Sequence, residues 1–215
     1  MKILAAYKKY QIMPQLQEHQ FRVAAVADFI CQNFQDQADR QNIVAACLLH
    51  DMGNIVKFTF NQDTAYMTGL AEQEQFDYWQ AVKQEFIAKY AADSHTATVK
   101  IVEELGVSSR IAELVDCVGF DQASDNLRSD DFGKKICAYS DMRVMPLGLA
   151  SLEDRLADLR VRYHNHPEGV QKREDFENAL RQIENQIFKH CGIKPSDITA
   201  GAIRGRKERL KNFEI

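Results

Sequence analysis

The sequence contains few of the residues that interrupt helices. Only four prolines and ten glycines are spread over 215 residues, and apolar residues recur three or four positions apart almost everywhere. Strict alternation of polar and apolar residues, the pattern of a half-buried strand, is missing over any useful length. The sequence therefore predicts an all-α protein, and its 215 residues are enough for a sizeable core.

Long apolar runs are missing as well. No stretch approaches the roughly 20 apolar residues that a bilayer crossing requires, and the apolar start of the chain, Met1–Lys8, is too short for a secretory signal. The cysteines form no C-x-x-C pair and lie mostly at apolar helical positions: Cys31, Cys47, Cys117, Cys137 and Cys191. We therefore expect reduced core thiols in a cytoplasmic protein that has no contact with a membrane.

The chain also lacks an excess of positive charge. Its 27 basic and 31 acidic residues give a net charge of −4, so the molecule as a whole is not suited to attract nucleic acid or anionic lipid. The exception is the segment 204–211, where five basic residues accompany the single acid Glu208. This basic tail is typical of a solvated helix end, and a contact with RNA or another partner is the alternative.

Helix-starting and helix-ending residues divide the chain into segments. Pro14 suits a first helical turn, Asp39 and Ser108 suit N-terminal caps, and Gly106 and Gly119 suit helix ends. A loop is expected from 57 to 69 because the periodicity is weak there. Helices are expected at 14–34, 39–53, 72–90, 94–105, 108–118, 130–144, 151–163 and 167–191.

Four polar residues lie where the pattern predicts burial. His19 and Asp141 are flanked at helical spacing by apolar side chains, and a buried aspartate is costly unless it is paired or bound to a cation. The adjacent pair His50-Asp51 closes a helix, whose end is partly negative and favours a cation. One such residue alone is most often a hydrogen-bonded core residue. Together, two imidazoles and two carboxylates suit a borderline or hard divalent ion.

The order His19, His50-Asp51, Asp141 resembles the H…HD…D signature of the HD-domain superfamily of metal-dependent phosphohydrolases. The surrounding residues are similar too: EHQFRVA at 18–24, ACLLHDMG at 46–53 and YSDMRV at 139–144. The last of these, followed by SLEDR at 151–155, resembles a bacterial subgroup of hydrolases. The resemblance extends over about residues 12–165.

This resemblance implies a helical bundle with a metal site in its centre. Residues 1–165 would form the HD domain, and residues 166–215 a helical extension packed on the same domain. His19, His50, Asp51 and Asp141 would hold a divalent ion, one per chain, drawn from Mn, Co, Ni, Mg, Fe and Zn. The implied reaction is attack on phosphorus by metal-activated water, with a nucleotide or a related small phosphoester as substrate.

Several further side chains are candidates for catalysis. Arg22 lies one turn after His19 and Arg143 two residues after Asp141, so either could hold phosphate oxygens or form a surface ion pair. Many relatives carry Lys or Glu at the third position after the HD pair, where this chain has Asn54. Lys57 is the expected substitute if that segment stays helical. The general acid and base remain unassigned.

His95 is the last candidate. It resembles an additional histidine of two-metal members of the superfamily, and its helix pattern places it on the buried side. A second ion would need a ligand near position 72, where this chain has Glu72 and Glu74. We therefore expect His95 to bind phosphate, or to serve as an acid, beside a single ion.

Two other functions fit the same residues. A diiron oxygenase on this scaffold needs six ligands, and the sequence offers at most five. A metal-bearing binding or regulatory module needs no acid or base, and the basic tail would be its contact to RNA.

Overall fold

The centre of the fold is the pair α2 (Pro14–Gln32) and α3 (Arg40–Leu49). The computed structural model describes residues 1–36, 38–162 and 169–215. Helix α2 begins with Pro14, whose missing N–H is one of those that a helix start leaves unpaired in any case. Its apolar stripe of Leu16, Val23, Val26 and Ile30 is buried as expected, because α3, α9 (Phe132–Asp141) and α12 (Ala200–Leu210) pack around it.

Helix α3 ends four residues earlier than the sequence predicts. His50 follows its last residue, Leu49, and the chain then turns into the 3₁₀ helix η1 (Asn54–Lys57). Gly53 in this turn donates its N–H to Thr98 Oγ1 at 2.9 Å, and a Cβ at Gly53 would lie 2.5 Å from the backbone nitrogen of Thr98. Close packing against α6 (Ser94–Leu105) therefore ends α3 and requires glycine at this position.

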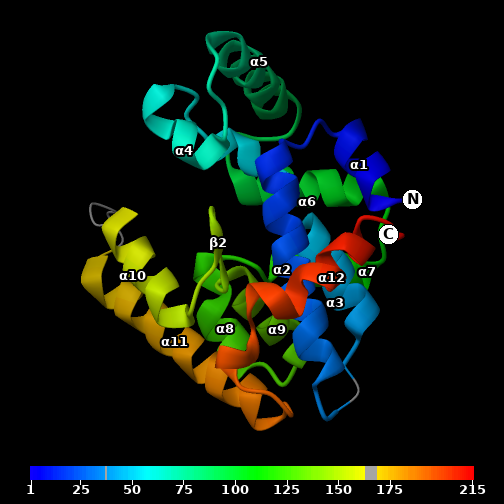
Figure 1. The fold of residues 1–215 in the computed structure, drawn as a ribbon, viewed down its shortest axis with the longest axis vertical. Helices are drawn as coiled ribbons and strands as arrows, with labels where there is room; N and C mark the ends of the chain where they lie inside the picture. Colours follow the sequence, from blue (N-terminus) through cyan, green and yellow to red (C-terminus); the bar gives the residue numbers. More distant parts are fainter. Residues whose placement is uncertain (37, 163–168) are drawn as a thin grey trace.

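Helices α5 (Gln73–Lys89), α6 and α7 (Ser109–Asp116) agree with the predicted segments. Asp93 caps α6 by accepting the N–H of Thr96, and Gly106 ends it with a φ of 68°. The segment expected to be a loop contains two short turns, η2 (Gln62–Thr64) and α4 (Ala65–Thr68). Figure 1 shows α4 and α5 at the top of the bundle.

The second half of the chain contains elements that the sequence pattern did not indicate. These are η3 (Phe120–Gln122), α8 (Ala123–Arg128), and a hairpin in which β1 (Val144–Met145) pairs with β2 (Gly148–Leu149). The hairpin is the reason why α9 ends at Asp141 rather than at 144. Apart from this ribbon the described residues are helical or irregular, so the all-α prediction is confirmed.

The remaining helices are α1 (Ile3–Lys9), α10 (Leu152–Arg162), α11 (Gly169–Lys189) and the turn η4 (Pro195–Asp197). Helix α11 packs on α8 and α9, and α10 lies beside it along one side of the bundle (Figure 1). The expected boundary between 165 and 166 lies outside the described residues, so the division into domain and extension stays a prediction. None of the helices in the described ranges has the length and apolar character that a membrane crossing requires.

The basic tail forms most of α12 and is neither free nor fully solvated. Arg206 contacts Asp28 of α2 at 2.7 Å, and Lys207 contacts Glu18 of the same helix at 2.6 Å. Lys211 pairs with Glu208, whereas Arg204 and Arg209 are exposed. Two of the five basic residues, Arg206 and Lys207, therefore attach α12 to α2.

Candidate metal centre

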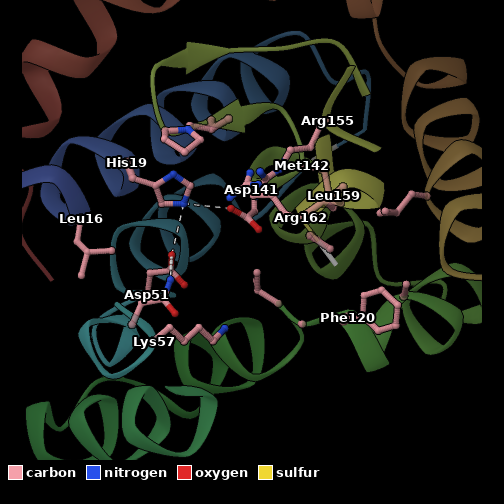
Figure 2. A pocket seen from close by; sticks show the side chains of 18 of the residues that line it. Leu16, His19, Asp51, Lys57, Phe120, Asp141, Met142, Arg155, Leu159 and Arg162 are labelled. Atoms are coloured by element: carbon pink, nitrogen blue, oxygen red, sulfur yellow. Dashed lines mark hydrogen bonds and ion pairs between the residues drawn. The ribbon is translucent and has the colours of Figure 1, made fainter. Parts of the chain in front are cut away.

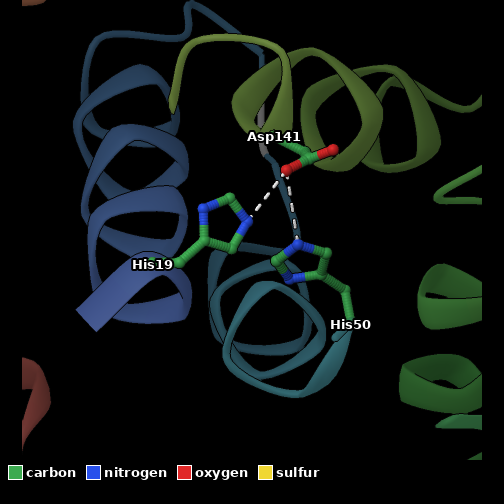
Figure 3. Close-up of side chains that lie close together, drawn as sticks. All are labelled: His19, His50 and Asp141. Atoms are coloured by element: carbon green, nitrogen blue, oxygen red, sulfur yellow. Dashed lines mark ion pairs between the residues drawn. The ribbon is translucent and has the colours of Figure 1, made fainter. Parts of the chain in front are cut away.

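Three side chains from three helices converge at the middle of the bundle (Figure 3). His19 comes from α2, His50 from the end of α3 and Asp141 from the last position of α9. The Nε2 atoms of His19 and His50 lie 3.1 and 3.4 Å from Asp141 Oδ1. One ligand atom from each residue lies within 4.8 Å of the other two, close enough for all three to bind one ion.

Asp51 lies beside this group. Its Oδ2 is 3.5 Å from His19 Nε2 and 3.7 Å from His50 Nε2. Neighbouring residues on a regular helix point about 100° apart, but α3 ends at Leu49, and His50 and Asp51 both turn towards the same point. Asn54 Nδ2 donates to Asp51 Oδ2 at 2.8 Å and orients that carboxylate.

The hydrogen bonding of His50 fits a metal ligand. Its Nδ1 lies 2.8 Å from the carbonyl oxygen of Cys47, which can only accept, so Nδ1 carries the hydrogen. The other ring nitrogen, Nε2, is buried and has no hydrogen-bond partner among the described residues. In the neutral ring Nε2 is a buried acceptor without a donor, which costs free energy, and a cation held between Nε2 and the two carboxylates would satisfy it.

The pKa values of His50 and Asp141 show that a cation would replace a proton in this group. Burial lowers the pKa of His50, but the carboxylates of Asp51 and Asp141 outweigh it and raise that pKa to about 9. Burial acts to raise the pKa of Asp141, yet His19 and His50 hold it well below its usual value. Without a cation, His50 therefore retains a proton that a divalent ion must displace.

Comparison with known proteins agrees with this arrangement. The family model of the HD domain matches residues 16–125, more than half of the chain. The chain belongs to the HD-domain family. The matched segment contains His19, His50 and Asp51 but ends before Asp141, which the fold brings to the same point. Neither the curated proteins nor the solved structures that were searched contain a match.

The candidate metal centre of this HD domain lies at one wall of a cavity of about 310 Å³ (Figure 2). His19, Asp51 and Asp141 line that wall, with Asn54 and Lys57 beside them. Apolar side chains cover much of the rest, including Phe58, Leu159, Phe120 and Phe176; the last two stack with ring centroids 4.2 Å apart. HD domains hold divalent metals, and the His19–His50–Asp141 group is where this chain could bind one.

Two arginines expected at the phosphate do not reach this cavity. Arg143 is buried, and its guanidinium donates to Tyr139 Oη at 2.7 Å, Ala150 O at 2.7 Å and Pro195 O at 3.1 Å. It ties α9 to the segments that follow. Arg22 pairs with Glu18 at 3.1 Å and donates to Pro146 O. Neither lines the cavity, which corrects their assignment as phosphate-binding residues.

His95 also lies elsewhere. Its side chain is 43% exposed, its Nε2 is 2.9 Å from Asp116 Oδ1, and it does not line the cavity. The expectation that it is buried is therefore wrong, because Ser94 and Thr98 occupy the buried face of α6, and its position gives no support to its assignment to the site. Among the described residues no second group of three metal-binding side chains occurs, and Glu72 and Glu74 are exposed.

Lys57 is the one additional catalytic candidate that the structure places at the cavity. It follows Asn54 by a single 3₁₀ turn, which keeps both residues on the same wall. Sequence reasoning missed Arg155 and Arg162, which also line the cavity and lie seven residues apart on α10. That spacing of two helical turns was the signal that could have identified them.

Proposed function

We propose that this HD domain hydrolyses a small phosphate ester with the help of one divalent ion. His19, His50, Asp51 and Asp141 would hold the ion, which is one of Mn, Co, Ni, Mg, Fe and Zn. Bound there, it would supply a water of lowered pKa and polarise a phosphoryl oxygen. The convergence of the His19–His50–Asp141 group on the wall of a cavity is the observation that supports this proposal.

Lys57 is the side chain best placed to bind the scissile phosphate. It lines the cavity on the same wall as Asp51, and its ammonium has no ion-pair partner among the described residues. A free ammonium beside ligand carboxylates attracts the anionic substrate and balances charge on the phosphoryl oxygens. Among the described residues that line the cavity, we assign none as the general acid.

The rest of the cavity favours a substrate with an apolar or aromatic part. A volume of about 310 Å³ suits a small ligand, and the stacked pair Phe120–Phe176 offers a flat apolar surface. A nucleotide or a similar small phosphoester fits both features. The described cysteines are all free, in keeping with a cytoplasmic protein. The packing of α12 gives no support to RNA as a partner.

The test combines metal analysis with turnover. Protein purified without added metal is analysed for ions, and then assayed against a panel of phosphate esters with each of the six metals. We expect about one ion per chain, and we expect Asp141→Asn to lose the ion and at least about a hundredfold in rate. His95→Ala is the matched control, because this exposed histidine lies outside the cavity, and it should keep both ion and rate.

Other outcomes point to other functions. Full activity of metal-depleted protein, or of Asp141→Asn, would refute the proposed centre. Uptake of oxygen with iron would favour an oxygenase, and a bound ion without turnover of any ester would favour a regulatory module.

A further inference from the structure

A second charged cluster lines the same cavity. Arg155 and Arg162 of α10 lie seven residues apart, so both point to one face of the helix and both line the cavity. Asp158 lies between them and contacts both: Arg155 Nη1 donates to Asp158 Oδ2 at 2.9 Å, and Arg162 Nη2 contacts the same oxygen. In Figure 2 the two labelled arginines lie on the side of the cavity away from Asp51 and Lys57.

The charges of this cluster do not cancel. Two guanidinium groups share a single carboxylate oxygen, which leaves one net positive charge. Asp158 itself does not line the cavity, so the surface that faces a ligand is more positive than the cluster as a whole. Among the described residues, the acidic side chains that do line the cavity are Asp51 and Asp141, both in the proposed metal centre.

Arg155 also has an unused donor. Its Nε is buried and has no hydrogen-bond acceptor among the described residues. A buried donor without an acceptor costs on the order of 1–3 kcal/mol, more for a charged group. An acceptor supplied by a ligand would remove that cost, and a phosphate offers several oxygens to the planar face of a guanidinium.

We propose that Arg155 and Arg162 bind a second phosphate group of the substrate. The proposal rests on the function proposed above and narrows it to small molecules with two phosphates, one at the metal centre and one at α10. Asp158 is a positioning residue: its carboxylate accepts from both arginines and holds them on one side of the cavity, and the phosphate would take over part of these hydrogen bonds. Lys57 lies on the opposite wall and serves the first phosphate.

The first experiment measures binding without metal, so that it does not depend on hydrolysis. Inorganic phosphate is titrated by calorimetry into chelator-treated protein. We expect Arg155→Gln/Arg162→Gln to weaken binding by roughly tenfold to a hundredfold, the value of lost charge-assisted hydrogen bonds. Asp158→Asn should strengthen binding, because it removes the competing carboxylate. Arg128→Gln, which removes an exposed arginine outside the cavity, is the control and should not change binding.

The arginine variant should weaken phosphate binding and the Asp158 variant should strengthen it. These opposite changes separate ligand binding from a structural role. A purely structural ion pair would be weakened by either change, so unchanged or weaker phosphate binding by Asp158→Asn would overturn the proposal. Equal binding by the double arginine variant and wild type would also overturn it. Thermal melting of each variant checks folding, and Asp158→Asn provides the test if the double variant is unfolded.

The second experiment compares butyl phosphate with butane-1,4-diyl bisphosphate as substrates of the metal-loaded protein. The ratio of kcat/KM for bisphosphate over monophosphate should fall about tenfold or more in the double variant. An unchanged ratio would contradict the second phosphate site. If wild type binds phosphate through the arginines but hydrolyses neither ester, the proposed function fails while the binding site stands.

Discussion

At the scale of single residues, Asn54 is a departure from the pattern that the family resemblance implies. The family resemblance implies Lys or Glu at this position, and an amide cannot replace the charge of either. In this chain the amide donates to Asp51 Oδ2, while Lys57, one 3₁₀ turn later, brings a positive charge to the cavity. The two roles that a single longer side chain could combine are thus divided between Asn54 and Lys57.

Asn54 should act on the metal through Asp51. Replacing Asn54 by Ala frees the carboxylate to rotate, and the loss of such an orienting hydrogen bond typically costs about 10–100-fold in metal affinity. Asn42→Ala is a matched control, since Asn42 donates to Asp39 Oδ2 at the same 2.8 Å and the same spacing of three residues, away from the site. Competition with a fluorescent chelator measures the affinity. Equal loss in both variants, or none in Asn54→Ala, would argue against a positioning role.

The candidate metal-binding residues could be recognised in the sequence because their chemistry conflicts with their surroundings. His19 and Asp141 stand out as polar residues in apolar helix faces, and His50-Asp51 as a pair at a helix end. Arg143 and His95 were misassigned because small rotations decide where a side chain points. The chain turns into β1 after Asp141, which carries Arg143 to Ala150 and Pro195, and His95 lies one position from the buried Ser94.

At the scale of elements, helices with local start and stop signals were predicted best. The segment 94–105 matches α6 because Asp93 caps it and Gly106 ends it within the local sequence. Helix α8 has no such signals. It is held by a hydrogen bond from Asn126 Nδ2 to the carbonyl of Cys117 and by packing on α11, and neither can be inferred from neighbouring residues. The early end of α3 likewise depends on contact with α6.

One of the two carboxylates of α2 that pair with α12 is buried. Asp28 accepts from Arg40 and Arg206 at 2.7 Å each and is 5% exposed. Asp28→Ala should lower the free energy of unfolding by roughly 2–4 kcal/mol, because it leaves the mostly buried Arg206 unpaired. Urea denaturation measures the change. Asp125→Ala, which breaks an exposed pair with Arg128, should cost less than about 1 kcal/mol. Similar losses in the two variants would contradict this view of α12.

At the scale of the whole molecule, the cavity is formed by segments that are distant in the sequence. The matched HD segment, residues 16–125, supplies His19, Asp51 and Lys57, whereas α9 and α10 supply Asp141 and the two arginines. Composition and periodicity predict the helices but not which faces meet. The convergence of the four candidate ligands was expected from family resemblance, whereas the two arginines of α10 were not expected at the cavity.

The protonation of the metal group connects it to the stability of the entire chain. Without metal, the folded-state pKa of His50, about 9, lies above the ordinary histidine value of 6.5. A raised pKa stabilises the folded state fully below pH 6.5, and this contribution is lost as pH rises through about 9. The metal-free protein should therefore become less stable over this window. Metal binding requires neutral His50, so the stabilisation that a bound ion adds increases as pH rises over the same window.

Metal removal should accordingly have a larger effect at high pH than at low pH. An ion at a hundredfold excess over its dissociation constant adds about 2.7 kcal/mol, which corresponds to roughly 5–10 °C in Tm for a chain of this size. At a fixed metal concentration the difference in Tm between metal-loaded and chelator-treated wild type should be greater at pH 8.5 than at pH 6.5, because displacing one proton changes the affinity by up to about tenfold per pH unit. His19→Ala should respond weakly to chelator at both values. If wild type melts at the same temperature with and without metal, the ion does not bind among these buried side chains. If the difference in Tm shrinks at high pH, the proton that the ion displaces is not the one on His50.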